Sequence, residues 1–308
     1  MTRIFLRRVV QSIGVTILSL SSVAHAANFS LPASNQALIG NVDHISAATG
    51  DTTITVAERY NLGLNAVMAA NPGITTTTAF PVGSTVTVNK QFLLPPLPRK
   101  GIVVNLPEMR MYYYPEGSDQ VMTFPVGIGK IGKIIPIMKT SIARKVTNPV
   151  WIPPADIRQY DREVLGINPP AVMPAGPDNP LGPYGIYLRI PTYLIHSTIF
   201  PESIGTRASF GCIRMNEADI KQFFPLVKPG TVVELIDMPN KIAWDGDELY
   251  LEAHPPLEDR TYDGINGLVQ TITSNLPRNH VTLVNWQLVA YIEDQPDGIP
   301  HEIGVQLN

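Results

Sequence analysis

The chain has 308 residues, enough for two or three domains. It is 44% hydrophobic and 16% charged with a formal net charge of −3, values that fit a folded globular protein and lack the basic excess of a nucleic-acid binder. Its 29 prolines indicate many extended segments and ordered loops, because proline is excluded from helix interiors and central strands.

Residues 1–26 have the pattern of an export signal. Arginines near the start precede the apolar run Val9–Leu20, and "AHA" at 24–26 supplies small residues at the −3 and −1 positions of a cleavage site. The apolar run is about a dozen residues long, which is too short to span a bilayer comfortably and argues against a membrane anchor. We expect the mature chain to start near Ala27, outside the cytoplasm and without a transmembrane helix.

The segment 40–89 has the pattern of a small β-α-α-β unit. Its sequence "GDTTITVAERYNLGLNAVMAANPG" predicts two short helices separated by Gly63, and strand-like residues lie on either side, around Val42–Ala47 and at Thr85–Val88. Through "GDT", "AANPG" and "VGSTVTV" this unit resembles a LysM module. The resemblance implies binding of N-acetylglucosamine-containing glycan, with a spacer that has no ligand as the alternative.

A proline-rich linker at 90–99 leads into a strand-rich region. Short β-branched or aromatic runs predict its strands: "GIVVNL", "MRMYYYP", "VMTFPVGIG", "YGIYLRI", "YLIHS" and "GTVVELI". One helix is expected at Glu217–Phe224, with Asn216 as its N-cap. The tail, 239–308, shows further strand signals in "ELYLEAH" and "HVTLVNWQLVAYI" but no motif tied to chemistry.

Two kinds of ligand site find no support in the sequence. "GIGKIG" at 127–132 matches a dinucleotide-binding motif, but a β-branched segment broken by Pro136 follows in place of the required helix, so we expect a glycine-rich hairpin. The five histidines beyond the signal form no H-x-x-x-H or H-x-H pair. We therefore expect neither a cofactor nor a metal.

Cys212, in "RASFGCIRMN", is the only cysteine of the chain. A single thiol in an exported protein is either a small buried apolar side chain or a reactive group. His196 ends the apolar run "YLIHS", 16 positions earlier. Because a nearby imidazole can accept the thiol proton and leave the reactive thiolate, the two residues together favour a nucleophilic Cys212 with His196 as its base.

The residues around the cysteine suit the same chemistry. Gly211 permits a tight turn, and the backbone N–H groups of Gly211 and Cys212 could stabilise an oxyanion. Arg207 and Arg214 flank the thiol and could bind a substrate carboxylate in bidentate fashion. Ordinary surface pairing is the alternative, and it is weighed equally for Arg207 and less for Arg214.

At these residues the chain closely resembles the YkuD-type L,D-transpeptidase catalytic domain, in particular that of periplasmic enzymes of Gram-negative bacteria. The resemblance runs from about Lys100 to Asp237 and includes "FPVGIGKIGKIIPIMKTSIARKVTNPVWIPPADIR", "MPAGPDNPLGPYGIYL", "YLIHST" and "SFGCIRMNEADI". It implies a mainly β, sandwich or barrel-like catalytic domain at 100–238 with a short helix after the cysteine motif. The LysM-like module before it and the 239–308 extension behind it match the layout of that subgroup.

The resemblance also implies roles. Cys212 would be the nucleophile, His196 the proton donor and acceptor, and the backbone carbonyl of Ser197 the group that orients the imidazole. Many members carry a second histidine just before the Gly-Cys pair, where this chain has Phe210. That departure leaves the backbone oxyanion donors unchanged and leaves His196 as the sole candidate base.

The implied substrate is the tetrapeptide stem of peptidoglycan. The acceptor would be an amine of a neighbouring stem, giving a 3→3 cross-link, or a lysine of an outer-membrane lipoprotein; with water as acceptor the enzyme would be an L,D-carboxypeptidase. Carbapenems would be inhibitors. Two alternatives from other classes stay open: a non-catalytic wall-binding scaffold with an inert Cys212, and a cysteine peptidase of proteins.

Overall fold

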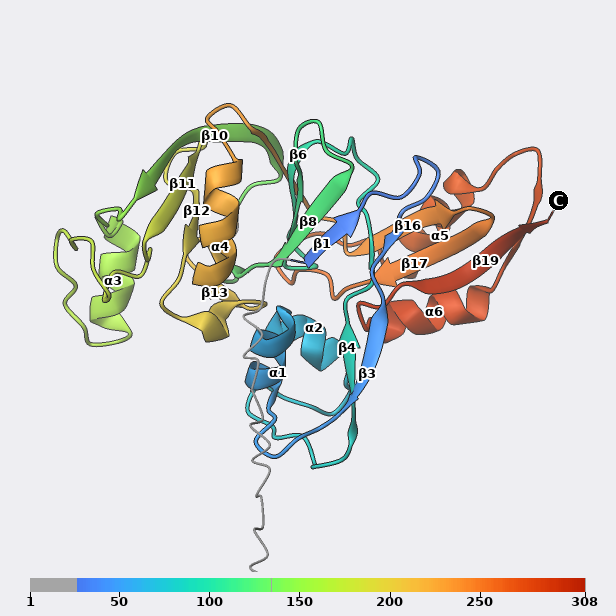
Figure 1. Cartoon of the computed structure of the whole chain (residues 1–308), viewed down its shortest axis with the longest axis horizontal. Coiled ribbons are helices and arrows are strands. Elements are labelled where there is room, and N and C mark those ends of the chain that lie inside the picture. The colour runs from blue at the N-terminus through green and yellow to red at the C-terminus, as the bar shows by residue number, and fades with distance from the viewer. Residues whose placement is uncertain (1–26, 134, 308) are drawn as a thin grey trace, which may run out of the picture.

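The computed structural model describes residues 27–133 and 135–307. The expected signal peptide, 1–26, lies outside the described residues. Figure 1 shows three regions side by side: a large curled sheet with its helices, a small α/β module beneath its centre, and a C-terminal α/β region at the right. No helix among the described residues is long and apolar enough to cross a membrane.

The largest sheet has nine strands, and it contains the six runs expected as strands between 100 and 238. Its members in spatial order are β1 (Ala27–Ser30), β8 (Gln120–Pro125), β7 (Arg110–Tyr114), β6 (Gly101–Asn105), β15 (Val232–Ile236), β10 (Met138–Thr147), β11 (Tyr184–Leu188), β12 (Leu194–Ser197) and β14 (Ile213–Met215). Neighbours run antiparallel except the pairs β6–β15 and β12–β14, which are parallel. The mainly β fold expected from the sequence is thus confirmed.

Strand β10 turns this sheet around a corner. Its first half pairs with β15 and its second half with β11, and the register shifts between Ile142 and Arg144. Such an irregularity bends a strand and increases its twist. The sheet therefore curls far enough that Met111 on β7 and Ile213 on β14 belong to one hydrophobic core. Helix α4 (Glu217–Phe223) packs Phe223 into this core. A 3₁₀ turn, η2 (Phe224–Leu226), follows the helix directly.

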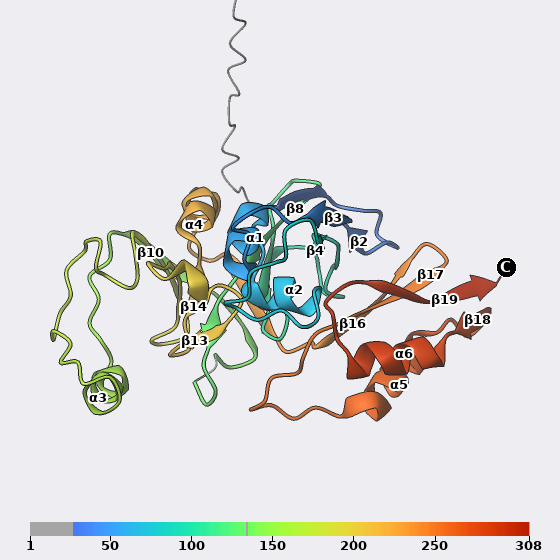
Figure 2. The same cartoon turned by 90° about the horizontal axis from the view of Figure 1, so that it is seen from below.

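The small module has the β-α-α-β order that its sequence predicts. It consists of β3 (Val42–Ser46), α1 (Thr53–Tyr60), α2 (Leu64–Ala69) and β4 (Thr85–Asn89), with β3 and β4 paired antiparallel around a separate hydrophobic core. Thr52 forms a capping box with Thr55 at the start of α1. We call this unit, 40–89, the LysM-like module. Seen from below, it lies between the curled sheet and the C-terminal region (Figure 2).

Residues 90–99, expected to be a linker, are packed against other parts of the chain. Strand β5 (Phe92–Leu93) pairs with β2 (Leu38–Ile39), and Leu94 is also buried. These apolar side chains join a second core on the outer face of β6 and β7. Both faces of those two strands are therefore covered, which explains their nearly continuous apolar sequences.

The C-terminal region is mixed α/β, whereas the sequence analysis expected a β-rich extension. Strands β16 (Asn240–Asp245), β17 (Glu248–Ala253), β19 (His301–Leu307) and β18 (Val281–Val284) form its sheet in that order, covered by α5 (Gly264–Asn275) and α6 (Trp286–Asp294). Of the strand expected in "HVTLVNWQLVAYI", only the first half forms, as β18. The rest is α6, because Asn285 accepts from the Leu288 N–H and caps a helix there.

The "GIGKIG" segment is a turn and not a hairpin. After β9 (Ile128–Gly129) the Lys133 N–H donates to Lys130 O, and β9 pairs with β13 (Arg207–Ser209), not with the strand that follows it in sequence. Of the described residues between β9 and β10, none is helical. In the proline-rich segment that follows β10, helix α3 (Ala155–Glu163) forms, which the sequence analysis missed.

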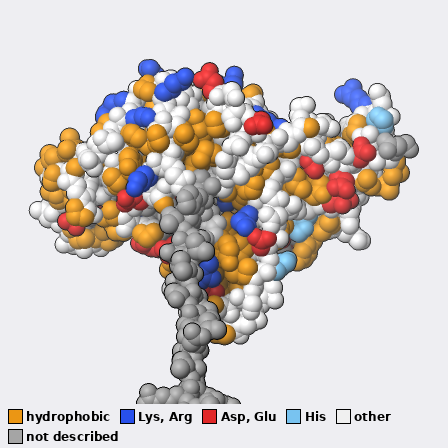
Figure 3. All heavy atoms as spheres, in the orientation of Figure 1, with side chains coloured by type: hydrophobic (Ala, Val, Ile, Leu, Met, Phe, Trp, Pro, Cys, Tyr) orange, Lys and Arg blue, Asp and Glu red, His pale blue; other side chains and the backbone are white. Residues whose placement is uncertain are grey.

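The segment around α3, which we call the 148–183 segment, exposes many aliphatic side chains. No residue of α3 is buried. Figure 3, which has the orientation of Figure 1, shows hydrophobic side chains gathered at the left end of the molecule, where this segment lies. Its half-exposed to exposed aliphatics are Val150, Ile152, Val164, Leu165, Ile167 and Val172.

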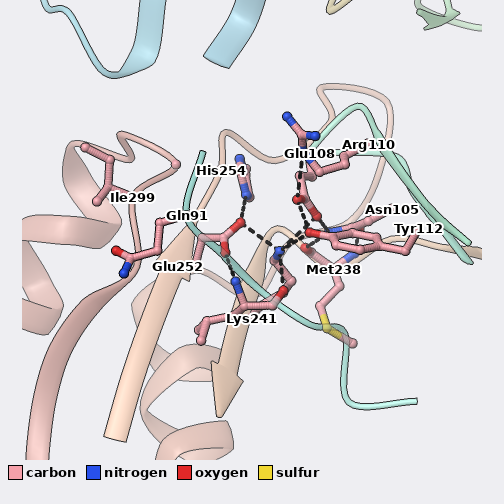
Figure 4. A network of polar contacts seen from close by, with 12 residues as sticks. Gln91, Asn105, Glu108, Arg110, Tyr112, Met238, Lys241, Glu252, His254 and Ile299 are labelled. Carbon is pink, nitrogen blue, oxygen red and sulfur yellow. Dashed lines mark hydrogen bonds and ion pairs between the residues drawn. The ribbon is translucent and has the colours of Figure 1, made fainter. Parts of the chain in front are cut away.

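A buried charge network joins the curled sheet, the 90–99 segment and the C-terminal region (Figure 4). The Lys241 ammonium of β16 is fully buried and lies 2.7 Å from a Glu252 oxygen and 3.0 Å from a Glu108 oxygen. It also donates to Leu93 O at 2.7 Å and to the Tyr112 hydroxyl at 2.9 Å. Although burial raises the pKa of Glu108, the Lys241 charge holds it below its ordinary value.

We expect Lys241→Met to destabilise the protein severely. The substitution leaves two buried carboxylates without their cation, and breaking such a buried pair costs about 4 kcal/mol. Equilibrium urea unfolding, followed by fluorescence, measures the loss. Lys228→Met is the matched control, because Lys228 pairs with Glu116 at the surface. Equal stability of the two variants would show that the network does not hold the regions together.

Candidate active site

The register of two parallel strands brings His196 and Cys212 to one face of the sheet. Ile195 lies opposite Ile213, and His196 lies opposite Arg214. Both isoleucines are fully buried in the core. Because side chains alternate between faces along a strand, His196, Arg214 and Cys212, which directly precedes β14, share the other face. The two residues expected to react are therefore diagonal neighbours on adjacent strands.

The imidazole of His196 is held in one tautomer. It is buried, with 4% of its surface exposed, and Nδ1 lies 2.5 Å from the backbone oxygen of Ser197. A carbonyl can only accept, so Nδ1 carries the hydrogen and Nε2 keeps its lone pair. Burial, helped by the positive charge of Arg214, lowers the pKa of His196 to about 4. The ring is therefore neutral at pH 7, as a general base must be.

The thiol of Cys212 is also neutral at rest. Solvent reaches part of the residue, but protein packs closely around it, and burial raises the thiol pKa to about 11. The backbone of Leu194 and the charge of Arg214 act in the opposite direction. The sulfur lies 3.7 Å from Thr192 O, to which the S–H donates. Thr192 has a φ of 72°, a strained value for a β-branched residue, in the turn that leads into β12.

Gly211 is required by its surroundings. Its φ is 112°, and a Cβ there would lie 2.8 Å from the Tyr193 ring and 3.0 Å from Lys133 O. Its N–H, expected to be an oxyanion donor, donates to Ser209 Oγ at 3.1 Å. Ser209 Oγ in turn donates to Cys212 O, which closes a tight turn. To serve an oxyanion, the Gly211 N–H would have to exchange this hydroxyl for the substrate.

Arg214 places a positive charge beside the thiol and the imidazole. Its guanidinium lies 5.8 Å from the Phe200 ring, and its buried Nε has no hydrogen-bond partner among the described residues. Burial lowers the pKa of Arg214, while Cys212 and Glu202 act to raise it. An incompletely satisfied guanidinium facing the reactive pair suits an anionic group of a ligand.

Arg207, also expected to bind substrate, already has carboxylate partners in the protein. Its Nη2 lies 2.8 and 2.9 Å from the two oxygens of Asp259, and its Nη1 pairs with Glu258. Its Nε donates to Gly129 O at 3.2 Å. This side chain ties β13 to the segment that follows β17, and it would have to leave these partners to bind a ligand.

Phe210, two residues before Cys212, takes part in a cation–π contact. The Lys130 ammonium lies 3.7 Å from the Phe210 ring centre and 3.5 Å from that of Tyr160 on α3. Lys133 pairs with Asp156 of the same helix at 2.6 Å. These contacts hold the 148–183 segment beside the turn at 210–212, which we call the cysteine loop. The sequence analysis missed them because it did not predict α3.

In the described part of the chain, one trio of side chains has metal-ligand spacing: Glu108, Glu252 and His254. The Lys241 ammonium lies within hydrogen-bonding distance of both carboxylates. The trio thus surrounds a cation that the protein itself supplies.

Comparison with known proteins identifies the family. A model of the YkuD L,D-transpeptidase catalytic domain matches residues 99–235. Over 294 residues the chain is 36% identical to the probable L,D-transpeptidase YcfS of Escherichia coli K12, covering 93% of this chain and 91% of the relative. The chain belongs to the L,D-transpeptidase family. The resemblance expected from the sequence is thereby confirmed, and with it an acyltransferase class of enzyme.

A second relative agrees with this assignment, and a solved structure is also similar to part of the chain. The probable L,D-transpeptidase ErfK/SrfK of Salmonella typhimurium is 40% identical over 258 residues, which cover 82% of each chain. The solution structure of the catalytic domain of the Enterococcus faecium L,D-transpeptidase is 21% identical, covering 46% of this chain and 99% of that domain with a TM-score of 0.35. The full-length relatives carry the assignment, since so low a TM-score adds nothing to it.

The resting charge state predicts how the thiol reacts with a small alkylating agent. Because the thiolate fraction grows tenfold per pH unit below a pKa of about 11, the rate of iodoacetamide alkylation should rise about tenfold per unit from pH 7 to 9.5. Mass spectrometry at each pH gives the rate, with Cys212→Ser as the blank. A plateau reached by pH 8 would instead reveal a preformed thiolate–imidazolium pair.

Proposed function

We propose that the protein is a cysteine-dependent peptidoglycan L,D-transpeptidase. One observation carries the proposal: the only thiol of the chain shares a sheet face, on the adjacent strand, with an imidazole whose Nδ1 hydrogen is held by Ser197 O. Cys212 would attack the carbonyl carbon of the diamino acid, the third residue of a tetrapeptide stem. D-Alanine leaves, and the stem remains attached as a thioester.

Proton transfer in this reaction falls to His196. Its Nε2 accepts the thiol proton as the sulfur–carbon bond forms, so that no free thiolate is needed in the resting enzyme. The imidazolium then donates that proton to the amine of the departing D-alanine, which restores the neutral ring. An incoming amine then attacks the thioester carbonyl and gives a proton to the same nitrogen; as the carbon–sulfur bond breaks, the imidazolium returns that proton to the departing Cys212 sulfur, which restores the neutral thiol and the neutral ring. The acceptor is an amine of a second stem or a lysine of an outer-membrane lipoprotein.

Arg214 would bind the anionic part of the donor. The Nε group without a partner among the described residues, and the position opposite His196, favour it over Arg207, whose guanidinium pairs with Asp259 and Glu258. A guanidinium in this position can hold a stem carboxylate or the oxyanion of the tetrahedral intermediate.

The LysM-like module would bind the glycan strands from which the stems project. Holding the enzyme on its polymeric substrate raises the effective concentration of stems without adding catalytic groups. The location would be the periplasm, where the export signal would deliver the chain. Cleavage after Ala26 leaves β1, which begins at Ala27 and pairs with β8, intact.

We expect a covalent adduct when residues 27–308 are incubated with a disaccharide-tetrapeptide or with meropenem. Intact-mass spectrometry detects the thioester or the opened carbapenem on the wild type, and Cys212→Ala gives the blank. The muropeptide sample should also release D-alanine. A folded wild type that forms no adduct with either compound would favour the non-catalytic scaffold.

The products separate transpeptidase from carboxypeptidase. Transfer to an added amine, or a 3→3 dimer in the muropeptide sample, identifies the transpeptidase. Tripeptide alone in the presence of excess acceptor identifies an L,D-carboxypeptidase. Cleavage of casein without release of D-alanine would identify a peptidase of proteins.

We expect loss of Arg214 to affect the rate of acylation, and loss of Arg207 to affect mainly the stability of the protein. Arg214→Ala should slow acylation by meropenem roughly tenfold to a hundredfold, since a hydrogen bond to a charged group is worth about 1.5–3 kcal/mol. Arg207→Ala should lower the unfolding temperature while changing the acylation rate much less. Both rates come from time-resolved intact-mass spectra. The reverse order would assign the carboxylate-binding role to Arg207.

A further inference from the structure

The LysM-like module is docked directly on the loop that joins the two reacting residues. Gly63, in the turn between α1 and α2, and the first residues of α2 contact Ile204 and Gly205, which follow η1 (Pro201–Ser203) in the loop between His196 and Cys212. Figure 1 shows the module beneath this part of the catalytic region, and Figure 2, seen from below, shows it beside β13 and β14. The contact is made by backbone atoms as well as side chains.

The loop supplies the cap for helix α2. Its N-cap residue, Gly63, offers no side-chain cap. The first two helical N–H groups donate instead to carbonyls of the loop: Leu64 N to Ile204 O at 3.1 Å, and Asn65 N to Gly205 O at 3.2 Å. Helix N-termini require such acceptors, so the loop and the helix satisfy each other.

Two glycines let the backbones approach this closely. A Cβ on Gly205 would lie 2.3 Å from Leu64 N, and a Cβ on Gly63 would lie 2.9 Å from the Gly205 Cα. Gly205 also has a φ of 74°, which side chains rarely adopt. No other residue type fits at this contact without separating the module from the loop.

A buried side-chain bond fixes the module on the other side of the cysteine. The Asn61 amide, at the end of α1, donates to Asp219 Oδ1 at 2.9 Å. Asp219 is 1% exposed and lies in the first turn of α4, directly after the cysteine motif. The module thus contacts the chain both before and after Cys212.

From the loop, backbone bonds continue to the reactive face. Gly205 N donates to Val126 O at 3.1 Å, and Gly127 exchanges two bonds of 2.9 Å with Arg214. Arg214 in turn lies opposite His196. Backbone hydrogen bonds between successive segments therefore connect α2 to β14, the strand that carries Arg214 and directly follows Cys212.

We propose that the LysM-like module positions the active site, with Asn61 and Asp219 as positioning residues for acylation at Cys212. The module then does more than tether the enzyme to glycan: its docking sets the relative placement of the cysteine loop and β12. The reaction used to test this rests on the proposed function.

The test is acylation by meropenem, a small molecule that carries no glycan. Asn61→Gly removes the amide while glycine suits the left-handed conformation (φ 52°) at this helix end. Asn61→Gly and Asp219→Ala should each slow acylation about fivefold, and the double variant should be no slower than either alone, because the two residues act as a pair. Asp219→Asn keeps the oxygen that accepts from Asn61 and should restore most of the rate.

Asn285→Ala is the matched control. It removes one side-chain cap from α6 in the C-terminal region, away from the module contact, and should leave the acylation rate unchanged. Circular dichroism confirms that each variant is folded. Wild-type rates in folded Asn61→Gly and Asp219→Ala would overturn the proposal and leave the module as a tether only.

A wild type that is not acylated would overturn the proposed function, and hydrogen exchange then decides the inference separately. Faster amide exchange across residues 198–211 in Asn61→Gly than in wild type would support positioning by the module. Unchanged exchange there would overturn it.

Discussion

One buried ammonium sets the arrangement of this molecule. Lys241 has no access to water, so each of its hydrogens must find an acceptor within the protein, and these come from separate parts of the chain: Glu108, Glu252 and Leu93 O. Withdrawal of either carboxylate would leave fewer countercharges around the buried ammonium, and withdrawal of Leu93 O would remove one of its hydrogen-bond acceptors. The network also reaches the module, because Asn65 donates to Glu108 O at 3.2 Å. The relative placement of module, sheet and C-terminal region follows from this requirement.

Burial has the opposite consequence at the reactive face. In the network, opposite charges compensate one another and keep the carboxylates ionised. At Cys212 and His196, burial acts without a countercharge between the two residues and favours the neutral form of each. The positive charge of Arg214 adds to the effect of burial on the His196 pKa and opposes the effect of burial on the Cys212 pKa. Nucleophile and base thus rest uncharged, and charge separation is confined to the moment at which a carbonyl carbon is within reach.

Much of this could be predicted from the sequence where the pattern is local. Alternation and β-branched runs gave the strands of the curled sheet, and capping and spacing gave α1, α2 and α4. The pairing of His196 with Cys212 was recognisable because Cys212 is the only cysteine of the chain and His196 ends an apolar run. The family assignment came from the same motifs.

The remaining features depend on contacts between distant segments. Lys241 lies in "NKIAWD", where nothing in the sequence distinguishes a buried lysine from an exposed one. Arg207 acquires Asp259 only when the segment after β17 folds back. The Gly211 N–H was expected to be free because the hydroxyl of Ser209 could not be placed beside it. Helix α6 was missed because "QLVAYI" is as apolar as a strand, and its cap Asn285 was overlooked.

The position of Lys241 along the chain makes the catalytic region depend on the segment that follows it. Glu108 lies within the matched catalytic segment, 99–235, whereas Lys241 and Glu252 lie after it. The last strand of the C-terminal sheet, β19, lies between β17 and β18, so the strands that hold Lys241 and Glu252 are completed by the last described residues. A chain truncated after the matched segment would lose the ammonium that lies 3.0 Å from Glu108 and keep only Arg110, at 3.6 Å, beside that buried carboxylate. The catalytic segment is therefore not an independent unit of stability.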